Sequence, residues 1–275
     1  MPTQSIFSKN AAYQKFEVLL TNRNKRHKYH EFIVEGVRNI NEAVKNNWRI
    51  NSFIFPRGKK LSDWASGLLR DIQTSANYEL AEDLMSDLSG KENPSELIAV
   101  VSMKDNSENE MPMPVNPLFV LFDRPSNKGN LGTLIRSCDA FGANRLIITG
   151  HGVDIHDPEV IGASMGSFFN LPFTILSGNT EIDSYISQLK QKYPLLKIIG
   201  TTAHKQTNID EVDLTTPVLF LIGNETDGLN RHYIELSDIM ATIPMRETSS
   251  ASSLNVSCAA TVLLYEARRQ RMNPI

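Results

Sequence analysis

Short apolar runs that alternate with helix-like segments constrain the fold of the C-terminal part of this chain more than any other feature. Each run is five or six residues long and rich in Val, Ile, Leu and Phe, which is typical of strands buried on both faces. Such an alternation predicts an α/β fold: a mostly parallel sheet with helices on both faces. The expected strands are 118–122, 145–149, 172–176, 197–202, 218–222 and 239–243, and the expected helices are 131–141 and 253–270.

A smaller α/β/α domain is expected in front of this one, over residues 1–103. The polar, proline-containing stretch 104–116 has no periodicity and predicts a linker, so that the second domain covers 117–275. A length of 275 residues is consistent with two domains. In the first domain we expect helices at 11–20, 37–45 and 61–73 and strands at 31–34, 50–55 and 97–103.

The charge of the first domain is unevenly distributed, although the whole chain has a net charge of only −3. Residues 1–60 contain 12 Lys or Arg against 4 Asp or Glu, whereas residues 61–110 contain 3 against 11. The basic residues gather in 22–29 (NRNKRHKY), and such a patch is typical of a surface that binds a phosphate backbone. A solvated helix end is the alternative. The candidate RNA contacts here are Arg23, Lys25, Arg26 and Lys28.

Cysteine usage and the apolar runs bear on the compartment. The two cysteines, Cys138 and Cys258, show no CxxC spacing and fit free thiols in a reducing compartment. The longest apolar runs are too short to cross a bilayer, and the N-terminal MPTQSIFSKN lacks the apolar stretch of a secretory signal. We therefore expect a cytoplasmic protein.

Three loops have an unusual composition, and each follows an expected strand. Ligands of parallel α/β sheets collect on such loops. The first, 123–136 (DRPSNKGNLGTLIR), places Asn130 at an expected helix N-cap and Arg136 later on that helix. The loop has neither the GxGxxG pattern of a dinucleotide site nor a Walker pattern. By itself it is equally well explained as a capped strand–loop–helix connection.

The second and third loops are also ambiguous when each is taken alone. In 221–229 (LIGNETDGL), a buried strand leads directly into Asn224 and Glu225 between two glycines. In 243–257 (IPMRETSSASSLNVS), a strand ends at a proline, and a Ser/Thr-rich loop enters the last helix. The glycines are explained by a plain turn, and the hydroxyl groups by helix capping.

Taken together and in this order, the three loops resemble the sequence motifs of the SpoU/TrmH family of RNA methyltransferases, part of the SPOUT superfamily. The matching stretches are NLGTLIR (130–136), LIGNETDGL and IPMRETSSASSLNVS, and ASMGSFFNLP (163–172) is similar to the family segment between the first two motifs. In the first domain, FIVEGVRNINEA (32–43) is similar to the start of the ribosomal-protein-like substrate-binding domain that many members carry.

The resemblance implies a fold, an activity and a partner. The family's catalytic domain contains a deep trefoil knot, which binds S-adenosylmethionine in a bent shape. Its members are usually homodimers whose active sites lie at the subunit interface. They transfer the methyl group of the cofactor to a ribose 2′-hydroxyl of RNA. No metal is needed for this displacement.

The resemblance also implies roles for particular residues. The catalytic set is Arg136, Asn130, Glu225, Ser253 and Asn255, with Glu225 expected to organise the site and to contact Arg136 of the partner subunit. Lys128 is a departure from the family pattern: it is an additional cation beside the first motif and a further candidate RNA contact, and a simply solvated side chain is the alternative. The expected cofactor-binding residues are Thr201, Thr202, Leu221, Ile222, Gly223, Asn224, Gly228, Ile243, Pro244, Met245 and Leu254.

Other interpretations of the chain remain to be weighed. The cluster His151, Asp154, His156 and Asp157 could suggest a metal site, but the family has none there and a loop is the preferred account. Ribosomal RNA is favoured as substrate over transfer RNA because of the basic first domain. A non-catalytic RNA-binding assembly factor on the same fold is the main alternative. The absence of the GxGxxG pattern argues against a nucleotide-binding oxidoreductase.

Overall fold

The structure is a computed structural model of the chain, and it describes residues 2–90, 94–104, 113–204 and 206–272. The chain divides into two compact units. Unit 1 comprises Met1–Lys104 and Asp154–Asn170, and unit 2 comprises Asp105–Val153 and Leu171–Ile275. The segment 154–170 therefore packs with unit 1, although two strands of the second predicted domain flank it in sequence. The middle of the predicted linker, 105–112, lies outside the described residues.

Unit 1 is built on a five-stranded mixed sheet in the order β1-β4-β3-β5-β2. Strands β1, β4 and β3 run parallel, whereas β5 is antiparallel to β3 and β2. The strands are β1 (Thr3–Ile6), β2 (Glu31–Glu35), β3 (Ile50–Pro56), β4 (Asn77–Leu80) and β5 (Ile98–Ser102). The helices are α1 (Ala11–Thr21), α2 (Arg23–Tyr29), α3 (Val37–Lys45), α4 (Asp63–Asp71) and α5 (Glu82–Ser89). Side chains of α1, α5 and the sheet, among them Tyr13, Phe16 and Ile54, form its core.

The segment 154–170 completes unit 1 through polar and aromatic contacts. It carries α7 (Pro158–Ser164) and the short helix η2 (Ser167–Phe169). Trp48 donates its indole N–H to the carbonyl oxygen of Phe169 at 2.9 Å. The ring of Phe168 lies 5.3 Å from that of Trp48 and 5.7 Å from that of Phe32, between ring centroids. Because aromatic pairs at such distances add to the gain from burial, this segment is part of the unit 1 core.

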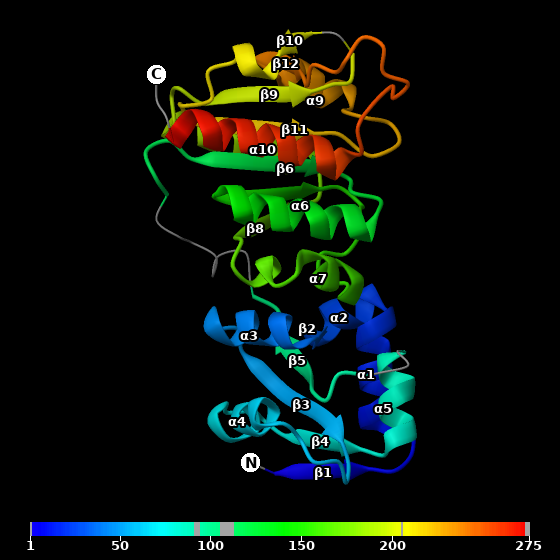
Figure 1. The fold of residues 1–275 in the computed structure, drawn as a ribbon. Helices are drawn as coiled ribbons and strands as arrows, with labels where there is room; N and C mark the ends of the chain where they lie inside the picture. The colour runs from blue at the N-terminus through cyan, green and yellow to red at the C-terminus, as the bar shows by residue number, and fades with distance from the viewer. Residues whose placement is uncertain (1, 91–93, 105–112, 205, 273–275) are drawn as a thin grey trace. The chain divides into compact units, whose positions relative to one another are not determined.

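Unit 2 contains a seven-stranded sheet in the order β10-β12-β9-β11-β6-β7-β8, and every neighbouring pair is parallel. Figure 1 shows these strands one beside the next. The strands are β6 (Leu118–Asp123), β7 (Arg145–Thr149), β8 (Phe173–Leu176), β9 (Lys197–Thr201), β10 (Thr207–Asn208), β11 (Val218–Ile222) and β12 (Ile239–Thr242). The sheet class expected from the apolar runs is confirmed, since β6, β7 and β11 are buried along their whole length.

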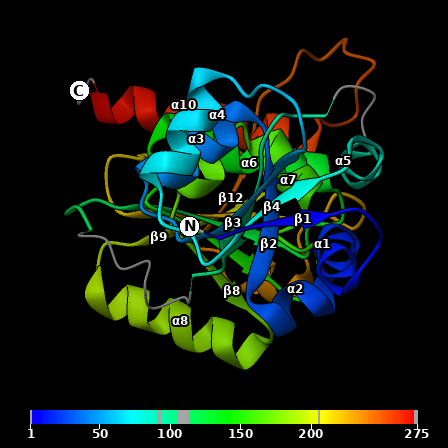
Figure 2. The same ribbon diagram turned by 90° about the horizontal axis from the view of Figure 1, so that it is seen from below.

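Helices cover both faces of this sheet. The helices are α6 (Lys128–Phe141), α8 (Asn179–Lys192), α9 (Arg231–Leu236), α10 (Val256–Met272) and the short η3 (Ile209–Glu211). Figure 2 shows α8 on one side of unit 2 and the pair α6 and α10 on the other. Tyr233 of α9 and Ile186 of α8 share a core with Phe119 and Leu219. No helix of the described residues is long and apolar enough to span a membrane. The trefoil knot stays a prediction from the resemblance.

Two helices next to the predicted motifs begin elsewhere than expected. Helix α6 begins at Lys128, because the side chain of Asn127 accepts a hydrogen bond from the backbone N–H of Asn130. The expectation that Asn130 caps this helix is therefore wrong, and Asn130 lies in its first turn. Helix α10 begins at Val256, where the side chain of Asn255 accepts from the N–H of Ser257. The first correction moves Asn130 from the expected cap into the helix, and the second moves Asn255 from inside the expected helix to the position just before it.

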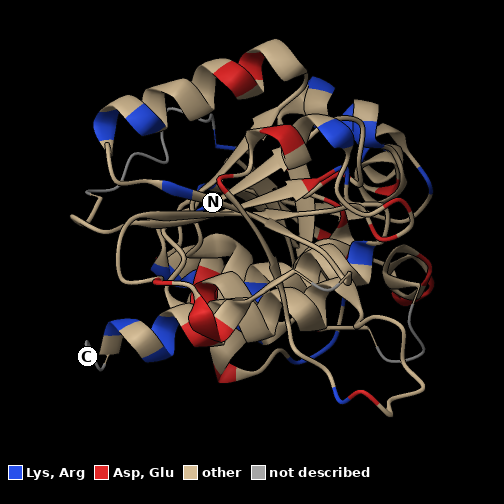
Figure 3. Ribbon diagram, turned by 90° about the horizontal axis from the view of Figure 1, so that it is seen from above, with Lys and Arg blue, Asp and Glu red and all other residues tan. Residues whose placement is uncertain are grey.

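The arginines near the end of α10 serve the fold of unit 2. Figure 3 shows the cations gathered at this end of the helix. Arg271 donates to the carbonyl oxygens of Leu214, Thr216 and Asn116, and burial lowers the pKa of its guanidinium. Arg269 pairs with Glu266 at 2.7 Å. Arg271 thus satisfies carbonyl groups that precede strands β6 and β11, and both cations complement the C-terminal end of the helix dipole.

Candidate active site

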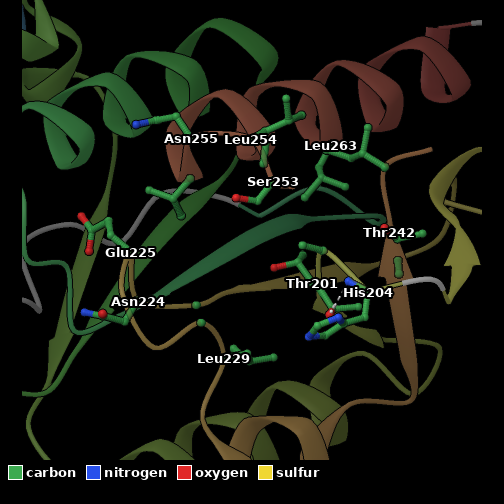
Figure 4. A pocket seen from close by; sticks show the side chains of 18 of the residues that line it. Thr201, His204, Asn224, Glu225, Leu229, Thr242, Ser253, Leu254, Asn255 and Leu263 are labelled. Atoms are coloured by element: carbon green, nitrogen blue, oxygen red, sulfur yellow. Dashed lines mark hydrogen bonds between the residues drawn. The ribbon is translucent and has the colours of Figure 1, made fainter. Parts of the chain in front are cut away.

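A cavity of about 650 Å³ lies in unit 2, where neighbouring parallel strands end. Strands β12, β9, β11 and β6 are adjacent and parallel, so their carboxyl ends meet at one edge of the sheet. The volume is within the range of roughly 300–1,000 Å³ that is typical of small-molecule sites. Figure 4 shows the side chains of many of the residues that line it. The lining residues are Asn130, Thr201, Thr202, Ala203, His204, Gly223, Asn224, Glu225, Thr226, Asp227, Gly228, Leu229, Ile234, Met240, Ala241, Thr242, Ile243, Met245, Ser253, Leu254, Asn255, Val256, Ala259 and Leu263.

The loop that follows β11 is a tight, internally bridged turn. The backbone N–H groups of Asn224 and Gly228 each donate to the carbonyl oxygen of the other, both at 2.9 Å. Gly228 has a φ of +69°, which favours glycine. A Cβ at Gly223 would lie 2.3 Å from backbone atoms of Gly228 and Leu229, so no other residue fits there. The two glycines of the second motif are thus required by the turn that closes one side of the cavity.

Both ends of this turn are fastened to the end of β6. Asn224 donates its side-chain N–H to the carbonyl oxygen of Arg124 at 2.7 Å. Asn230, after the turn, donates to the buried carboxylate of Asp123 at 3.1 Å. That carboxylate also accepts from the guanidinium of Arg124 and the hydroxyl of Thr149. Because the guanidinium of Arg124 pairs with Asp123, the negative charge of this carboxylate is compensated, and its other donors fix the position of the turn relative to the sheet.

Glu225 projects from the turn and accepts hydrogen bonds from the first motif loop. Its carboxylate accepts from the N–H and hydroxyl of Ser126 at 2.9 and 2.8 Å and from the N–H of Asn127 at 3.1 Å. The side-chain N–H of Asn130 lies 3.4 Å away. Burial raises the pKa of Glu225, but the hydrogen bonds from Ser126 and Asn127 outweigh it and hold the pKa below its ordinary value. Glu225 is therefore an ionised organiser of the rim of the cavity.

Asn130 joins the first two motifs to the third. Its side-chain oxygen accepts from the side-chain N–H of Asn255 at 3.1 Å, while its own N–H faces Glu225. The side-chain oxygen of Asn255 in turn accepts from the N–H and hydroxyl of Ser257 at 3.0 and 2.7 Å. One chain of hydrogen bonds thus links three loops that are separated by up to 125 residues in sequence.

Most residues proposed from the motifs meet at this cavity. Asn130, Glu225, Ser253 and Asn255 of the catalytic set line it, whereas Arg136 is exposed on α6 and does not. The cofactor candidates that line it are Thr201, Thr202, Gly223, Asn224, Gly228, Ile243, Met245 and Leu254. Three cofactor candidates do not line it: Leu221 and Ile222 are buried in β11, and Pro244 is exposed.

Several lining residues were not among the predicted ones. Apolar side chains from α9, β12 and α10 form one part of the wall, and His204 and Asp227 add titratable groups. In sequence, the spacing of Ala259 and Leu263 on the last helix was the one available signal, because residues four apart lie on the same face. The missed lining residues are Ala203, His204, Thr226, Asp227, Leu229, Ile234, Met240, Ala241, Thr242, Val256, Ala259 and Leu263.

Unit 1 requires a correction to the RNA-binding set. Arg23 and Lys28 are exposed on α2 and Lys25 is half-buried, but Arg26 is only 2% exposed. Its guanidinium donates to Asp154 at 2.7 Å and to the carbonyl oxygens of Leu19 and Leu20 at 3.0 and 3.1 Å. Arg26 is therefore unavailable to an RNA phosphate. Lys128 is half-buried in the first turn of α6.

The His/Asp loop has a structural role in the same place. Asp154 and Asp157 face the guanidinium of Arg26. Burial raises the pKa of Asp154, but hydrogen bonds to His156 and Arg26 outweigh it and hold that pKa well below the ordinary range. Within the described ranges, no group of three or more His, Cys, Asp or Glu residues is arranged to hold a metal ion.

The cavity can hold a ligand with a flat apolar part and a cationic part. Apolar side chains such as Leu229, Met240 and Leu263 can pack against an aromatic ring, and backbone groups at the strand ends can form hydrogen bonds with the edge of that ring. The carboxylates of Glu225 and Asp227 favour a cation near the rim. This combination is the chemistry of a nucleoside that bears a positive charge.

Comparisons with known proteins agree with this geometry. A family model described as the SpoU rRNA Methylase family matches residues 117–265, and one described as the SpoU L30e-like domain matches residues 10–99. The chain is 41% identical over 269 residues to a 23S rRNA (uridine(2479)-2′-O)-methyltransferase of Streptomyces viridochromogenes, covering 98% of this chain and 93% of that protein. It is 25% identical over 262 residues to the 23S rRNA (guanosine(2553)-2′-O)-methyltransferase RlmP of Bacillus subtilis, covering 95% and 97%.

A solved structure extends the agreement to the fold. The crystal structure of the SpoU methyltransferase AviRb from Streptomyces viridochromogenes, in complex with the cofactor AdoMet, matches with a TM-score of 0.89 at 41% identity. The match covers 96% of this chain and 99% of that one. The methylase model spans more than half of the chain, and the three motif loops that define the resemblance meet at one cavity. The chain belongs to the SpoU rRNA methylase family.

Proposed function

We propose that this protein transfers the methyl group of S-adenosylmethionine to a ribose 2′-hydroxyl of 23S ribosomal RNA. The observation that carries the proposal is the junction at Asn130, where all three motif loops meet on the rim of a nucleoside-sized cavity. The named activities of the relatives at 41% and 25% identity support the substrate class. Ribosomes are assembled in the cytoplasm of bacteria, and we propose that compartment for the protein.

The cavity suits S-adenosylmethionine in shape and charge. Its apolar wall, including Leu229, Met240 and Leu263, can enclose the adenine ring, while Glu225 and Asp227 favour the positive sulfonium. The structure of AviRb with bound AdoMet supports the same choice. When bound, the cofactor supplies an electrophilic methyl group to be attacked in line by an oxygen. The residues of the chain need only bind, orient and stabilise charge for this step.

Residues at the rim of the cavity have different roles in orienting the RNA ribose. Asn130 and Asn255 hold one another through a hydrogen bond, so the amide groups that remain are fixed in direction and can position a ribose or phosphate. Ser253 is exposed at the same rim. Glu225 already accepts from Ser126 and Asn127. Its lowered pKa makes it a poor proton acceptor, so it organises the loops rather than acting as the base.

Arg136 is proposed to act on the cavity of a partner subunit. The side chain is exposed on α6 and does not line the cavity of its own chain. On α10, which packs against α6, Val262 and Tyr265 are exposed apolar residues that a second copy could cover. A guanidinium is a poor base because it holds its proton above about pH 12. We therefore assign Arg136 to clamping the neighbouring phosphate and stabilising charge at the reacting oxygen.

Subunit mixing tests this arrangement. Asn130→Ala damages the cavity, and Arg136→Ala removes the arginine. If Arg136 acts across the interface, each mixed dimer of the two variants keeps one site with both residues intact, and mixing restores part of the lost activity. If Arg136 acts within its own chain, both sites of every mixed dimer are damaged, and mixing restores nothing. Sedimentation of the wild-type chain checks that it is a dimer.

The RNA is held by unit 1 as well as by the rim. Helix α2 exposes Arg23 and Lys28 and contains no acidic residue. Such a surface attracts a phosphate backbone, and its binding weakens as salt rises. The resemblance of residues 10–99 to the SpoU L30e-like domain supports this role.

The function is tested by incubating the full chain with tritiated S-adenosylmethionine and unmethylated transcripts of 23S rRNA, 16S rRNA and tRNA. Incorporation into 23S rRNA is expected, and primer extension at low dNTP then maps the 2′-O-methyl. Incorporation into tRNA alone would overturn the substrate assignment. Cofactor binding and RNA binding without any incorporation would instead favour the non-catalytic assembly factor.

A further inference from the structure

The cavity extends beyond the motif residues to the segment that follows β9, and His204 lies there. His204 lines the cavity together with Thr201 and Thr202 but belongs to none of the three motifs. Figure 4 shows its imidazole within the cavity, well away from Glu225. The backbone N–H of His204 donates to the hydroxyl oxygen of Thr202 at 3.1 Å. That bond fixes the backbone from which the imidazole projects.

The charges around the cavity single out this histidine. Among the described residues that line it, Glu225 and Asp227 are the acidic ones, and His204 is the one of a basic type. Glu225 has four donors at one end of the cavity, all of them from neutral groups. The two ends therefore differ: one carries an uncompensated carboxylate, and the other carries a side chain that donates hydrogen bonds.

The cofactor of the proposed function has two charged ends that match this polarity, and the inference rests on that function. The sulfonium must lie near the rim, where Asn130 and Asn255 can contact the ribose of the RNA. The methionyl part carries an α-carboxylate, which Glu225 and Asp227 would repel and which needs a donor. The hydroxyl of Thr201 already donates to the carbonyl oxygen of Leu221 at 2.9 Å. Thr202 and Thr242 also line the cavity with hydroxyl groups, and the imidazole of His204 adds a nitrogen donor at the end remote from Glu225.

We propose that an imidazole N–H of His204 donates a hydrogen bond to the α-carboxylate of S-adenosylmethionine and thereby selects a cofactor with an intact amino-acid end. His204 is thus a specificity-determining residue of the cofactor site. It takes no part in the methyl transfer itself. The orientation of the methionyl part then fixes which way the methyl group faces at the rim.

Ligands that differ at this end test the proposal by calorimetry, independently of activity. S-adenosylhomocysteine keeps the amino-acid end, whereas 5′-methylthioadenosine lacks it. In His204→Ala, the affinity for S-adenosylhomocysteine should fall about ten-fold or more, because a hydrogen bond to a charged group is lost. The affinity for 5′-methylthioadenosine should stay unchanged. His204→Gln, which keeps a donor, should recover most of the loss, and Gln206→Ala, an exposed neighbour outside the cavity lining, is the control.

Equal losses for both ligands would overturn the proposal, since His204 would then contact the adenosine part or support the fold. No loss for either ligand would overturn it as well. Failure of the function is a separate result: a chain that shows the expected ligand pattern but methylates no RNA keeps the assignment of His204 and loses the proposed reaction. If the wild-type chain binds neither S-adenosylmethionine nor S-adenosylhomocysteine, both proposals fall.

Discussion

Two buried or half-buried carboxylates in this protein are held in opposite ways. In unit 1, Asp154 is paired with the guanidinium of Arg26, a positive charge, at 2.7 Å. In unit 2, Glu225 accepts from backbone, hydroxyl and amide groups of Ser126, Asn127 and Asn130, and within the described ranges no Lys, Arg or His forms an ion pair with it. Both arrangements hold the pKa of the carboxyl below its ordinary value.

The difference separates a structural site from a functional one. The Arg26–Asp154 pair cancels its own charge, which is suited to a core that must exclude water. Neutral donors fix Glu225 equally well but leave its negative charge in place at the rim of the cavity. An uncompensated charge that is held in position is what a site needs to favour a cationic ligand or a developing positive charge. Breaking each arrangement should therefore affect different measurements.

The largest effect is expected from Arg26→Ala. The substitution leaves Asp154 and Asp157 buried without their cation, so the free energy of unfolding should fall by about 3–5 kcal/mol. Urea denaturation of the full chain measures it. Lys28→Ala, an exposed change on the same helix, should alter stability by less than about 0.5 kcal/mol and instead weaken RNA binding. Similar stabilities for the two variants would contradict the structural role of Arg26.

Arg136→Ala should act on catalysis without acting on the fold. The side chain is exposed, so unfolding should be unchanged. The cofactor affinity should stay close to wild type, because we assign Arg136 to the RNA phosphate and the reacting oxygen and not to the cofactor. The methylation rate should fall about 10²–10³-fold, as when a group that stabilises charge in the transition state is removed. Arg136→Lys, which keeps the charge and loses the forked geometry, should recover only part of the rate. A near wild-type rate for Arg136→Ala would remove the residue from the mechanism.

The strands of unit 2 could be predicted from sequence because each is a continuous apolar run between polar loops. The expected strands at 145–149 and 218–222 have those bounds in the structure. Helix α8 was missed, because its buried residues Ile182, Ile186 and Leu189 are spread among charged ones. The short helices α7 and α9 were missed because six or seven residues give little periodicity.

The site was predictable only where a motif marks it. Asn130, Glu225 and Asn255 belong to recognisable loops, and the structure brings them together. His204 and Met240 could not be assigned from sequence, because nothing local tells which side of a strand end or loop faces a ligand. The burial of Arg26 was equally hidden, since its partner Asp154 is 128 residues away. A charged residue in a sequence is expected to be exposed, but an ion-pair partner that is distant in sequence can bury it.

Glu225→Gln should sharpen the contrast with Arg26. The substitution removes the charge and keeps the size, so it should weaken binding of the cationic S-adenosylmethionine more than binding of S-adenosylhomocysteine, whose sulfur is neutral. The difference should be about 1 kcal/mol, or roughly five-fold, for charges separated by a partly solvated gap. Titration calorimetry with both ligands measures it. Glu247→Gln, an exposed carboxyl in the third motif loop, is the matched control. Equal losses for the two ligands would mean that Glu225 acts through loop geometry alone.

The smallest effect should appear in the pH dependence of stability. A carboxyl whose pKa is lowered in the folded state stabilises the fold fully above its unfolded pKa, about 4.3 for Glu, and this contribution is lost as the pH falls through the lower folded value. For Glu225 the pKa is lowered by hydrogen bonds from Ser126 and Asn127 despite partial burial. The difference in unfolding free energy between wild type and Glu225→Gln should thus stay constant from pH 7 to about pH 5 and shrink below that. Its size should be a fraction of a kcal/mol, because the group is partly exposed. Denaturation at a series of pH values measures this difference in unfolding free energy. If the difference grew as the pH fell, the folded protein would destabilise the anion of Glu225, and the donors Ser126 and Asn127 would not be what holds it.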